Sequence, residues 1–334
     1  MDAWPQARPF RLDGWFERNR FTPIWTMILV FVLAFILFQV VIAPVVIGIG
    51  IAIDMVQSGQ ESAPDMAELM ESLTERGGLL MTANTIGQVL GFGVLALLVA
   101  RLHTRQVGEY LRIRKPDLPG FGLAALGWAV LYPAVIWTGQ LNEMIPQPEW
   151  LNALEQSQVE LLEGILLGGD LSTPFLFVVL ALTPAICEEL LFRGYLQRQV
   201  ERRLGAVASI VLVGVLFGLY HLRLSQVVPL SILGIYLGYV VWATGSLWSG
   251  VLVHLLNNGL AVLVAGWARS TPDVDLDAIE AAGVPWYFGV LGIVLVAGVG
   301  YLLYLRRRAV VGEQPDAQPV EVDPPLSTPP LSIS

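Results

Sequence analysis

The sequence has little of what soluble globular domains contain. Among its 334 residues there is one cysteine, Cys187, which excludes an intrachain disulfide and leaves the redox compartment undetermined. Charged residues make up 14% of the chain, whereas soluble domains have about a quarter. The net charge of −9 gives no reason to expect a nucleic-acid partner. Together these shortages argue against an ordinary soluble fold.

Apolar residues are abundant instead, and they are grouped in blocks. They make up 55% of the chain, with a mean hydropathy of +0.64. A block of about 18 apolar residues can cross a bilayer as a helix. The sequence therefore predicts an all-α, polytopic bundle of about eight transmembrane helices in a cell membrane, plasma or inner. The expected spans are Ile24–Ile53, Leu79–Ala100, Phe121–Leu141, Pro174–Leu196, Ala206–Leu222, Val227–Ala243, Leu247–Trp267 and Trp286–Leu305.

The first, fifth and sixth of these spans have further features that the sequence predicts. The first is long enough to tilt or to bend at Pro44. The fifth and sixth are short and almost adjacent, so we expect them to form a tight hairpin. The first apolar block is too long for a signal-peptide core and has no small-residue cleavage site, so it is interpreted as a retained span.

Basic residues predict the orientation. Sixteen of the nineteen lie in segments that eight spans would place on one side: the N-terminal segment, 101–115, the end of the fourth span and the end of the last. Because Lys and Arg favour cytoplasmic loops, both termini are expected to be cytoplasmic. Residues 1–23 then form an N-terminal segment, 24–308 the bundle, and 309–334 a disordered, Pro-rich acidic tail. Trp150–Leu167 has apolar residues at helical spacing, which suits an interfacial helix or an amphipathic helix packed on the bundle equally well.

Ionisable residues inside apolar spans are costly and are therefore functional candidates. The fourth span contains Glu188, Glu189 and Arg193. Glu189 and Arg193 are four residues apart and can form an ion pair on one helical face. Glu188 points about 100° away and has no such local partner. Glu189 is thus expected to be mainly structural, and Glu188 is the candidate for chemistry.

Two histidines and an asparagine lie in neighbouring spans. His221 ends the fifth span, and His254 and Asn258 are four residues apart in the seventh, on one face. The third histidine, His103, falls in a basic loop. If the chain turns near Arg203, an antiparallel hairpin brings Glu188 and His221 to similar depth.

These residue types suit the hydrolysis of a bond by activated water. A carboxylate beside a histidine can act as general base, and a histidine with an amide can stabilise an oxyanion. Alternatively, Glu188, His221 and His254 could hold a divalent metal such as Zn²⁺. The spacing lacks the His-Glu-x-x-His helix of common zinc proteases, so the residues alone do not decide between the two. Cys187 is a weaker nucleophile candidate, because no histidine is near it in sequence.

The three groups together resemble the CAAX prenyl protease and bacteriocin-processing family of intramembrane endopeptidases, also called the CAAX protease self-immunity or abortive-infection family. Its pattern is Glu-Glu-x-x-x-Arg, then Phe-x-x-x-His, then His-x-x-x-Asn or Asp, each in a membrane helix. The sequence matches it in order within residues 174–267. The matching residues are Glu188, Glu189, Arg193, Phe217, His221, His254 and Asn258.

The resemblance implies an endopeptidase that cuts near the cytoplasmic leaflet. Glu188 and His221 would activate water, His254 and Asn258 would stabilise the oxyanion, and Glu189, Arg193 and Phe217 would support them. Metal-dependent and metal-free mechanisms have both been described for such proteins, and we favour the one without a cofactor. The substrate would be a peptide or a membrane-anchored protein, lipidated or not. The alternatives are a non-catalytic immunity or scaffold protein that binds a hydrophobic peptide or a membrane partner, and an ion-coupled transporter, which the lack of an internal repeat disfavours.

Overall fold

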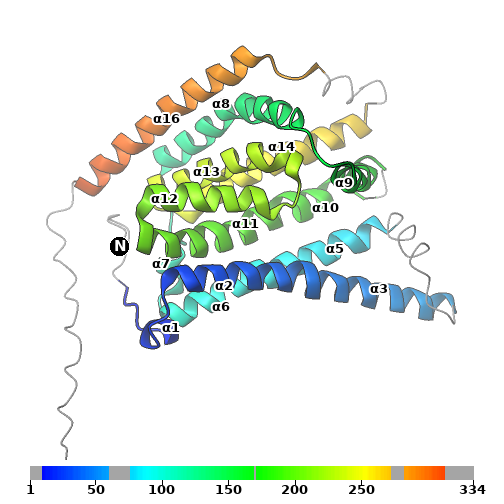
Figure 1. The fold of residues 1–334 in the computed structure, drawn as a ribbon, viewed down its shortest axis with the longest axis horizontal. Coiled ribbons are helices and arrows are strands. Elements are labelled where there is room, and N and C mark those ends of the chain that lie inside the picture. Colours follow the sequence, from blue (N-terminus) through cyan, green and yellow to red (C-terminus); the bar gives the residue numbers. More distant parts are fainter. Residues whose placement is uncertain (1–9, 60–75, 169–170, 272–281, 313–334) are drawn as a thin grey trace, which may run out of the picture.

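A computed structural model describes residues 10–59, 76–168, 171–271 and 282–312 (Figure 1). Helices dominate these residues, and no strand is found among them. The predicted all-α class is confirmed. Of the tail predicted at 309–334, residues 313–334 lie outside the described residues. The helices are α1 (Trp15–Arg18), α2 (Pro23–Phe35), α3 (Ala43–Ser58), α5 (Gly77–Gln88), α6 (Leu95–His103), α7 (Val107–Tyr110), α8 (Leu118–Glu143), α9 (Glu149–Leu167), α10 (Thr173–Phe177), α11 (Thr183–Glu189), α12 (Gln197–Tyr220), α13 (Val227–Thr244), α14 (Leu247–Arg269) and α16 (Trp286–Gly312).

Within the described residues, seven continuous helical segments are long and apolar enough to cross a membrane. The longest, Thr173–Tyr220, contains a break at Gly205, where φ is +82° and the backbone leaves the helical region. The chain reverses there, because Phe192 before the break and Phe217 after it have ring centroids 5.2 Å apart. This segment therefore supplies the predicted fourth and fifth spans, joined by a turn two residues from the expected position.

The second limb of this hairpin packs closely on α13. A Cβ added to Gly234 would lie 2.6 Å from the carbonyl oxygen of Gly214, so only glycine allows the two backbones to come this near. The connection between α12 and α13 holds a short 3-10 turn, Leu224–Gln226. The tight hairpin predicted for the fifth and sixth spans is confirmed.

Four π-helical segments interrupt the long helices: η1 (Ile36–Ile42), η2 (Val89–Val94), η3 (Val178–Leu182) and η4 (Leu190–Leu196). Two of them come just before prolines, Pro44 and Pro184. Proline has no N–H to donate to the carbonyl four residues before it, and its ring crowds that carbonyl, so the helix widens locally. The irregularity expected at Pro44 is thus a π-helical segment between α2 and α3. Such widened turns are frequent at functional sites.

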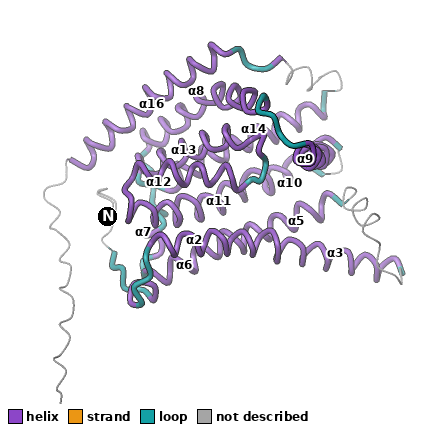
Figure 2. The backbone as a smooth tube through the Cα atoms, in the orientation of Figure 1, coloured by secondary structure: helices purple, strands orange, loops and turns teal. Residues whose placement is uncertain are grey.

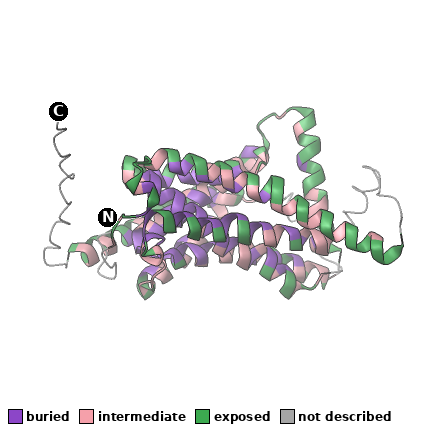
Figure 3. Cartoon of the chain, turned by 90° about the horizontal axis from the view of Figure 1, so that it is seen from below, coloured by how far each residue is buried: buried purple, intermediate pink, exposed green. Residues whose placement is uncertain are grey.

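The bundle has a central layer between two outer pairs. Helices α2–α3 and α5–α6 lie together on one side, α8 and α16 on the other, and α10–α11, α12, α13 and α14 between them (Figures 1 and 2). Buried residues are concentrated in the middle of the bundle (Figure 3). The polar residues of the sequence motifs come from this central layer.

Helices α9 and α16 cover two segments whose structure the sequence left open or placed differently. Helix α9 runs across the other helices (Figure 1) and buries Glu155 and Ile165 against them, as expected for a helix packed on the bundle. Its Trp150 is 70% exposed, so an apolar surface also faces outward. Helix α16 continues to Gly312, four residues past the predicted end of the bundle at 308. The helix persists because residues 309–311 are Ala-Val-Val, without the prolines that follow.

Candidate active site

A buried ion pair lies at the centre of the bundle. Arg193 NH1 is 2.6 Å from Glu189 Oε1, and both side chains are fully buried. Arg193 NH2 donates to the carbonyl oxygen of Gly234 at 3.0 Å, and the guanidinium lies 4.4 Å from the ring centre of Phe217. The contact expected from the four-residue spacing is present. It links the two limbs of the hairpin to α13.

Glu188 lies beside this pair and is held by fewer contacts. Its side chain is largely buried, with the residue 8% exposed. Gln88 Nε2 on α5 is 3.5 Å from Glu188 Oε1, at the long limit of a hydrogen bond. His254 Nε2 is 3.9 Å from Glu188 Oε2. Glu188 is thus the less constrained of the two carboxylates, as its place on the helix predicts.

His254 connects the two glutamates. Its Nδ1 is 3.0 Å from Glu189 Oε1, while its Nε2 faces Glu188. An ionised carboxylate can only accept, so Nδ1 carries the proton of this bond. One turn earlier, a Cβ added to Gly250 would lie 2.6 Å from Glu189 Oε2. The glycine therefore allows α14 to approach α11 closely enough for His254 to reach the pair.

Asn258 makes a different contact from the one its spacing suggests. Its Nδ2 donates to the carbonyl oxygen of Leu180 at 3.2 Å. Leu180 lies in η3, four residues before Pro184, and so lacks the usual α-helical donor. Asn258 supplies one. The structure shows no hydrogen bond between Asn258 and His254 among the described residues, although one N–H of the amide is still unused.

His221 lies at the end of α12, one aromatic ring away from the cluster. Its Nδ1 donates to the carbonyl oxygen of Phe217 at 2.8 Å, which leaves Nε2 as an acceptor. The Phe217 ring contacts both histidines, with centroid distances of 4.9 Å to His221 and 5.7 Å to His254. The structure therefore joins Glu188, Glu189, Arg193 and His254 directly, and places His221 behind Phe217. No hydrogen bond between His221 and Glu188 is found in the described part of the chain.

The donor set for a metal is not assembled in this arrangement. Across the described residues, no three His, Cys, Asp or Glu side chains form a group that could hold a metal ion. Glu188 and His254 are near one another, but His221 does not complete a three-ligand set with them. The residues as arranged do not fit a zinc site with three protein ligands. Cys187 is buried and packs near Gly93, with no histidine contact among the described residues.

Two polar groups near Glu188 were missed by the sequence analysis. Gln88 is 6% exposed, and its Oε1 has no hydrogen-bond partner among the residues that the structure describes. The Tyr220 hydroxyl is likewise buried with no partner in that part of the chain, and the rings of Phe92 and Phe192 pack around it. A glutamine inside an apolar span was the available signal for Gln88. Tyr220, adjacent to His221, gave none because tyrosine is common in membrane helices.

His103 is not the loop residue that the sequence suggested. It ends α6, is 1% exposed and lies 2.7 Å from Glu17 and 3.0 Å from the Tyr195 hydroxyl. Burial raises the pKa of Glu17, but the hydrogen bond from His103 and the charge of Arg202 outweigh burial and leave this pKa below its ordinary value. This cluster lies at the end of the bundle, apart from the candidate site.

Comparison with known proteins finds one family match, over the central helices. Residues 170–260 match the type II CAAX prenyl endopeptidase Rce1-like family. The matched region contains α10 to α12, α13 and the first half of α14, and therefore every residue of the candidate site except Gln88. The resemblance inferred from the motifs is confirmed over this region. The matching family is one of membrane enzymes of the CAAX-protease type, which are peptide hydrolases, and this supports a peptide hydrolase in general. No curated protein and no solved structure matches the chain.

Proposed function

We propose that the chain is an intramembrane endopeptidase that hydrolyses a peptide bond near the cytoplasmic leaflet, with Glu188 as the base that activates water. One observation carries the proposal: Glu188 lies 3.9 Å from His254, which is held by the buried Glu189–Arg193 pair. A carboxylate with few contacts of its own, beside an imidazole whose orientation is held by an ion pair, is an arrangement that suits the activation of water.

The charges of the cluster support distinct roles for the two glutamates. Glu189 pairs with the guanidinium of Arg193, so the negative charge of Glu188 is uncompensated when both carboxylates are ionised. The imidazolium form of His254 balances it, and in that form Nε2–H can donate toward a developing oxyanion. The unused N–H of Asn258 is the second proposed donor. Glu189 and Arg193 fix the histidine and do not take part in proton transfer.

The proposed reaction then proceeds in two steps. Glu188 takes a proton from water as the water oxygen bonds to the substrate carbonyl carbon, and the carbonyl electrons move to the oxygen. When the intermediate collapses, the C–N bond breaks and the proton on Glu188 passes to the leaving amine. His221, with Nε2 unengaged, assists this proton transfer from behind Phe217 once substrate is bound. The substrate proposed is a peptide or a membrane-anchored protein, with or without a lipid group.

The test is cleavage of defined peptides by the purified full-length protein in lipid nanodiscs. The panel contains a farnesylated C-terminal CAAX peptide, its unlipidated form and a transmembrane peptide with a juxtamembrane site, with products identified by mass spectrometry. Glu188→Gln is expected to lower kcat by about 10²–10⁴-fold, the usual contribution of a general base. Glu163→Gln, on the exposed face of α9, is the matched control and should keep full activity.

Three further experiments separate the alternatives. If the wild type binds but cuts no peptide of the panel, and Glu188→Gln keeps full cellular function, the chain acts as a scaffold or immunity protein and the proposal fails. Activity that disappears with a chelator and returns with Zn²⁺ would contradict the metal-free mechanism. Proton flux into liposomes that depends on Glu188 would instead favour the transporter.

A further inference from the structure

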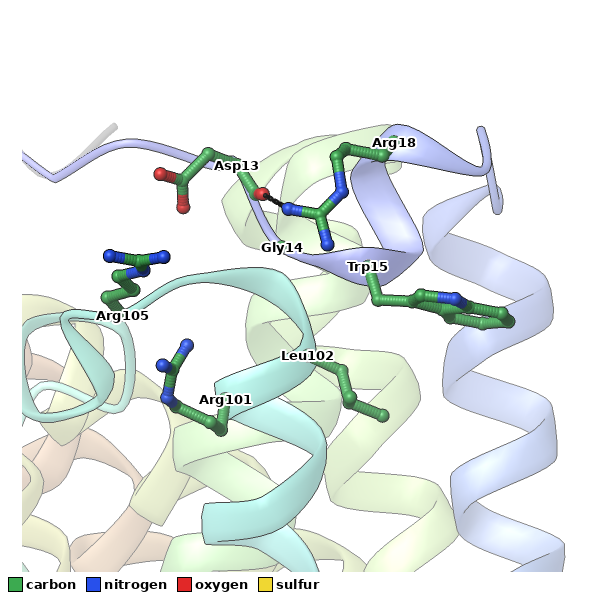
Figure 4. Close-up of a pocket in the computed structure, with 7 residues that line it drawn as sticks. All are labelled: Asp13, Gly14, Trp15, Arg18, Arg101, Leu102 and Arg105. Carbon is green, nitrogen blue, oxygen red and sulfur yellow. Dashed lines mark hydrogen bonds between the residues drawn. The ribbon is translucent and has the colours of Figure 1, made fainter.

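A cationic pocket lies at the end of the bundle, far in sequence from the motifs. It has a volume of about 360 Å³ and is formed where the segment before α1 crosses the end of α6 (Figure 4). The lining residues are Asp13, Gly14, Trp15, Arg18, Arg101, Leu102 and Arg105. Three guanidinium groups thus face one carboxylate, so the pocket has an excess of positive charge.

The described residues do not neutralise the positive charge of this pocket. Arg18 NH1 donates to the backbone carbonyl of Asp13 at 2.8 Å, which leaves its charge unbalanced. Arg101 and Arg105 make no hydrogen bond or ion pair with any residue that the structure describes. In Figure 4 both guanidiniums extend toward the segment that carries Asp13. Two guanidinium groups on one wall of a pocket, both without a described partner, suit the binding of an oxyanion such as a phosphate.

The walls of the pocket are held in place by tight packing. Gly14 N donates to the carbonyl oxygen of His103 at 2.8 Å. A Cβ added to Gly14 would lie 2.0 Å from the carbonyl oxygen of Leu102, so the close approach requires glycine. One turn further, Glu17 pairs with both His103 and Arg202. These contacts fix α1 against α6, so the pocket is a built feature of the fold.

The surroundings place the pocket at the depth of the lipid headgroups. Exposed apolar side chains run along α6 toward it, with Leu98 60% and Leu102 39% exposed. Trp15 at its edge and Trp25 nearby are 46% and 68% exposed. Exposed tryptophans mark the boundary between hydrocarbon and water, and the distribution of basic residues predicts that this end is cytoplasmic. A ligand here would have its acidic part among arginines and its apolar part along α6.

We propose that this pocket binds the phosphate headgroup of an anionic phospholipid, with the acyl chains along Leu98 and Leu102. Basic pockets at the cytoplasmic ends of membrane helices attract acidic headgroups, and each Arg near the surface contributes about a fivefold gain in affinity. A bound headgroup would join α1 to α6 through charge, in addition to the Gly14 contact. The proposal does not depend on peptidase activity.

Binding of fluorescent phosphatidylglycerol to the purified, delipidated full-length protein in neutral detergent tests it. The wild type should bind phosphatidylglycerol at least tenfold more tightly than phosphatidylcholine, and salt should weaken the binding. The double variant Arg101→Gln/Arg105→Gln should bind about 25-fold more weakly, from two losses of about fivefold each. Neither side chain has a hydrogen-bond or ion-pair partner within the described ranges, so folding should be unchanged, and thermal unfolding measures this.

The matched control removes the same charge elsewhere. Arg203→Gln/Arg308→Gln changes two exposed arginines outside the pocket and should leave phosphatidylglycerol binding within twofold of wild type. Equal losses in both double variants would overturn the proposal in favour of general surface charge. Displacement of the lipid by millimolar inorganic phosphate would identify a site for free phosphate and would overturn the lipid assignment. Equal affinity for the two lipids would also overturn it.

Discussion

The first and fourth apolar segments of this chain are both long and helical, but they lie in different surroundings. Pro23–Ser58 is the most apolar segment, yet only 17% of its most apolar stretch is buried within the protein. The corresponding share is 56% for Thr173–Tyr220, which carries both glutamates and Arg193. The first segment is therefore exposed over most of its apolar stretch, whereas the fourth is largely enclosed by protein.

The difference has a simple physical reason. In hydrocarbon an ionisable side chain has no partner, whereas inside a bundle it can pair with other side chains or with freed backbone carbonyls. The central helices can hold Glu188, Glu189, Arg193 and His254 because the outer helices shield them from lipid. The candidate site therefore lies in a segment enclosed by protein and not in the most exposed apolar segment.

The largest stability effect should come from breaking the buried ion pair. Arg193→Leu leaves Glu189 buried beside His254 without its cation, and we expect a loss of about 3–5 kcal/mol in the free energy of unfolding. Thermal or denaturant unfolding in detergent micelles measures it. The double variant Glu189→Leu/Arg193→Leu should recover part of the loss, because no charge is left unpaired. A loss no larger than that of Arg203→Leu, at an exposed position, would contradict the structural role of the pair.

Truncations of apolar residues compare the two surroundings directly. Leu191 is fully buried in the central layer, and Leu191→Ala should cost about 2–5 kcal/mol through lost packing and the cavity left behind. Ile49 on α3 is 56% exposed, so Ile49→Ala should change stability by less than about 0.5 kcal/mol. The same unfolding assay serves for both. Similar losses of stability at the two positions would show that the first segment, like the fourth, is packed against protein.

A moderate kinetic effect is expected at Gln88. Gln88→Leu removes the amide that faces Glu188 Oε1 and should lower kcat about tenfold with little change in KM, since the glutamine acts as a positioning residue through the base. A shifted pH profile of kcat would separate this from a general loss of folding. Gln158→Leu, at an exposed position of α9, should be neutral. An unchanged kcat in Gln88→Leu would leave the glutamine without a role at the site.

The smallest effect is expected at an ion pair outside the hydrocarbon region. The hydrogen bond from Arg306, with a further one from the Gly120 N–H, outweighs partial burial and holds the pKa of Asp117 below its ordinary value of 3.8. A carboxylate with a lowered pKa stabilises the fold above that ordinary value and loses this contribution as the pH falls through the folded-state pKa. Asp117→Asn keeps a helix cap but removes the charge. It should cost less than about 1 kcal/mol at pH 7, because the pair is partly exposed.

The measurement for Asp117 is the difference in Tm between wild type and Asp117→Asn as a function of pH. The difference should be largest near neutral pH and should shrink as the pH falls below 3.8. A difference that stays constant over this range would show that the carboxylate charge is not responsible. Comparison of this loss with that of Arg193→Leu measures how much burial changes the contribution of an ion pair to the free energy of unfolding.

Some contacts of the site could be predicted because they depend on local spacing. Glu189 and Arg193 are one helical turn apart, so their pairing needed only the helix. Other contacts could not. The partner of Asn258 is a carbonyl 78 residues away, exposed by Pro184, and no helical period indicates it. The burial of His103 was missed for the same reason, since Glu17 and Tyr195 come from distant segments.

The sequence by itself determined the all-α membrane class, the apolar spans and the helix faces of the motif residues, because these follow from hydropathy and from the fixed period of the helix. Only the tertiary structure decided which side chains meet. It placed His254 between Glu188 and Glu189 through a close approach at Gly250, brought Gln88 to the base, and left His221 one phenylalanine away. Such contacts depend on how near two helices come, and small residues and widened turns distant in sequence set that distance.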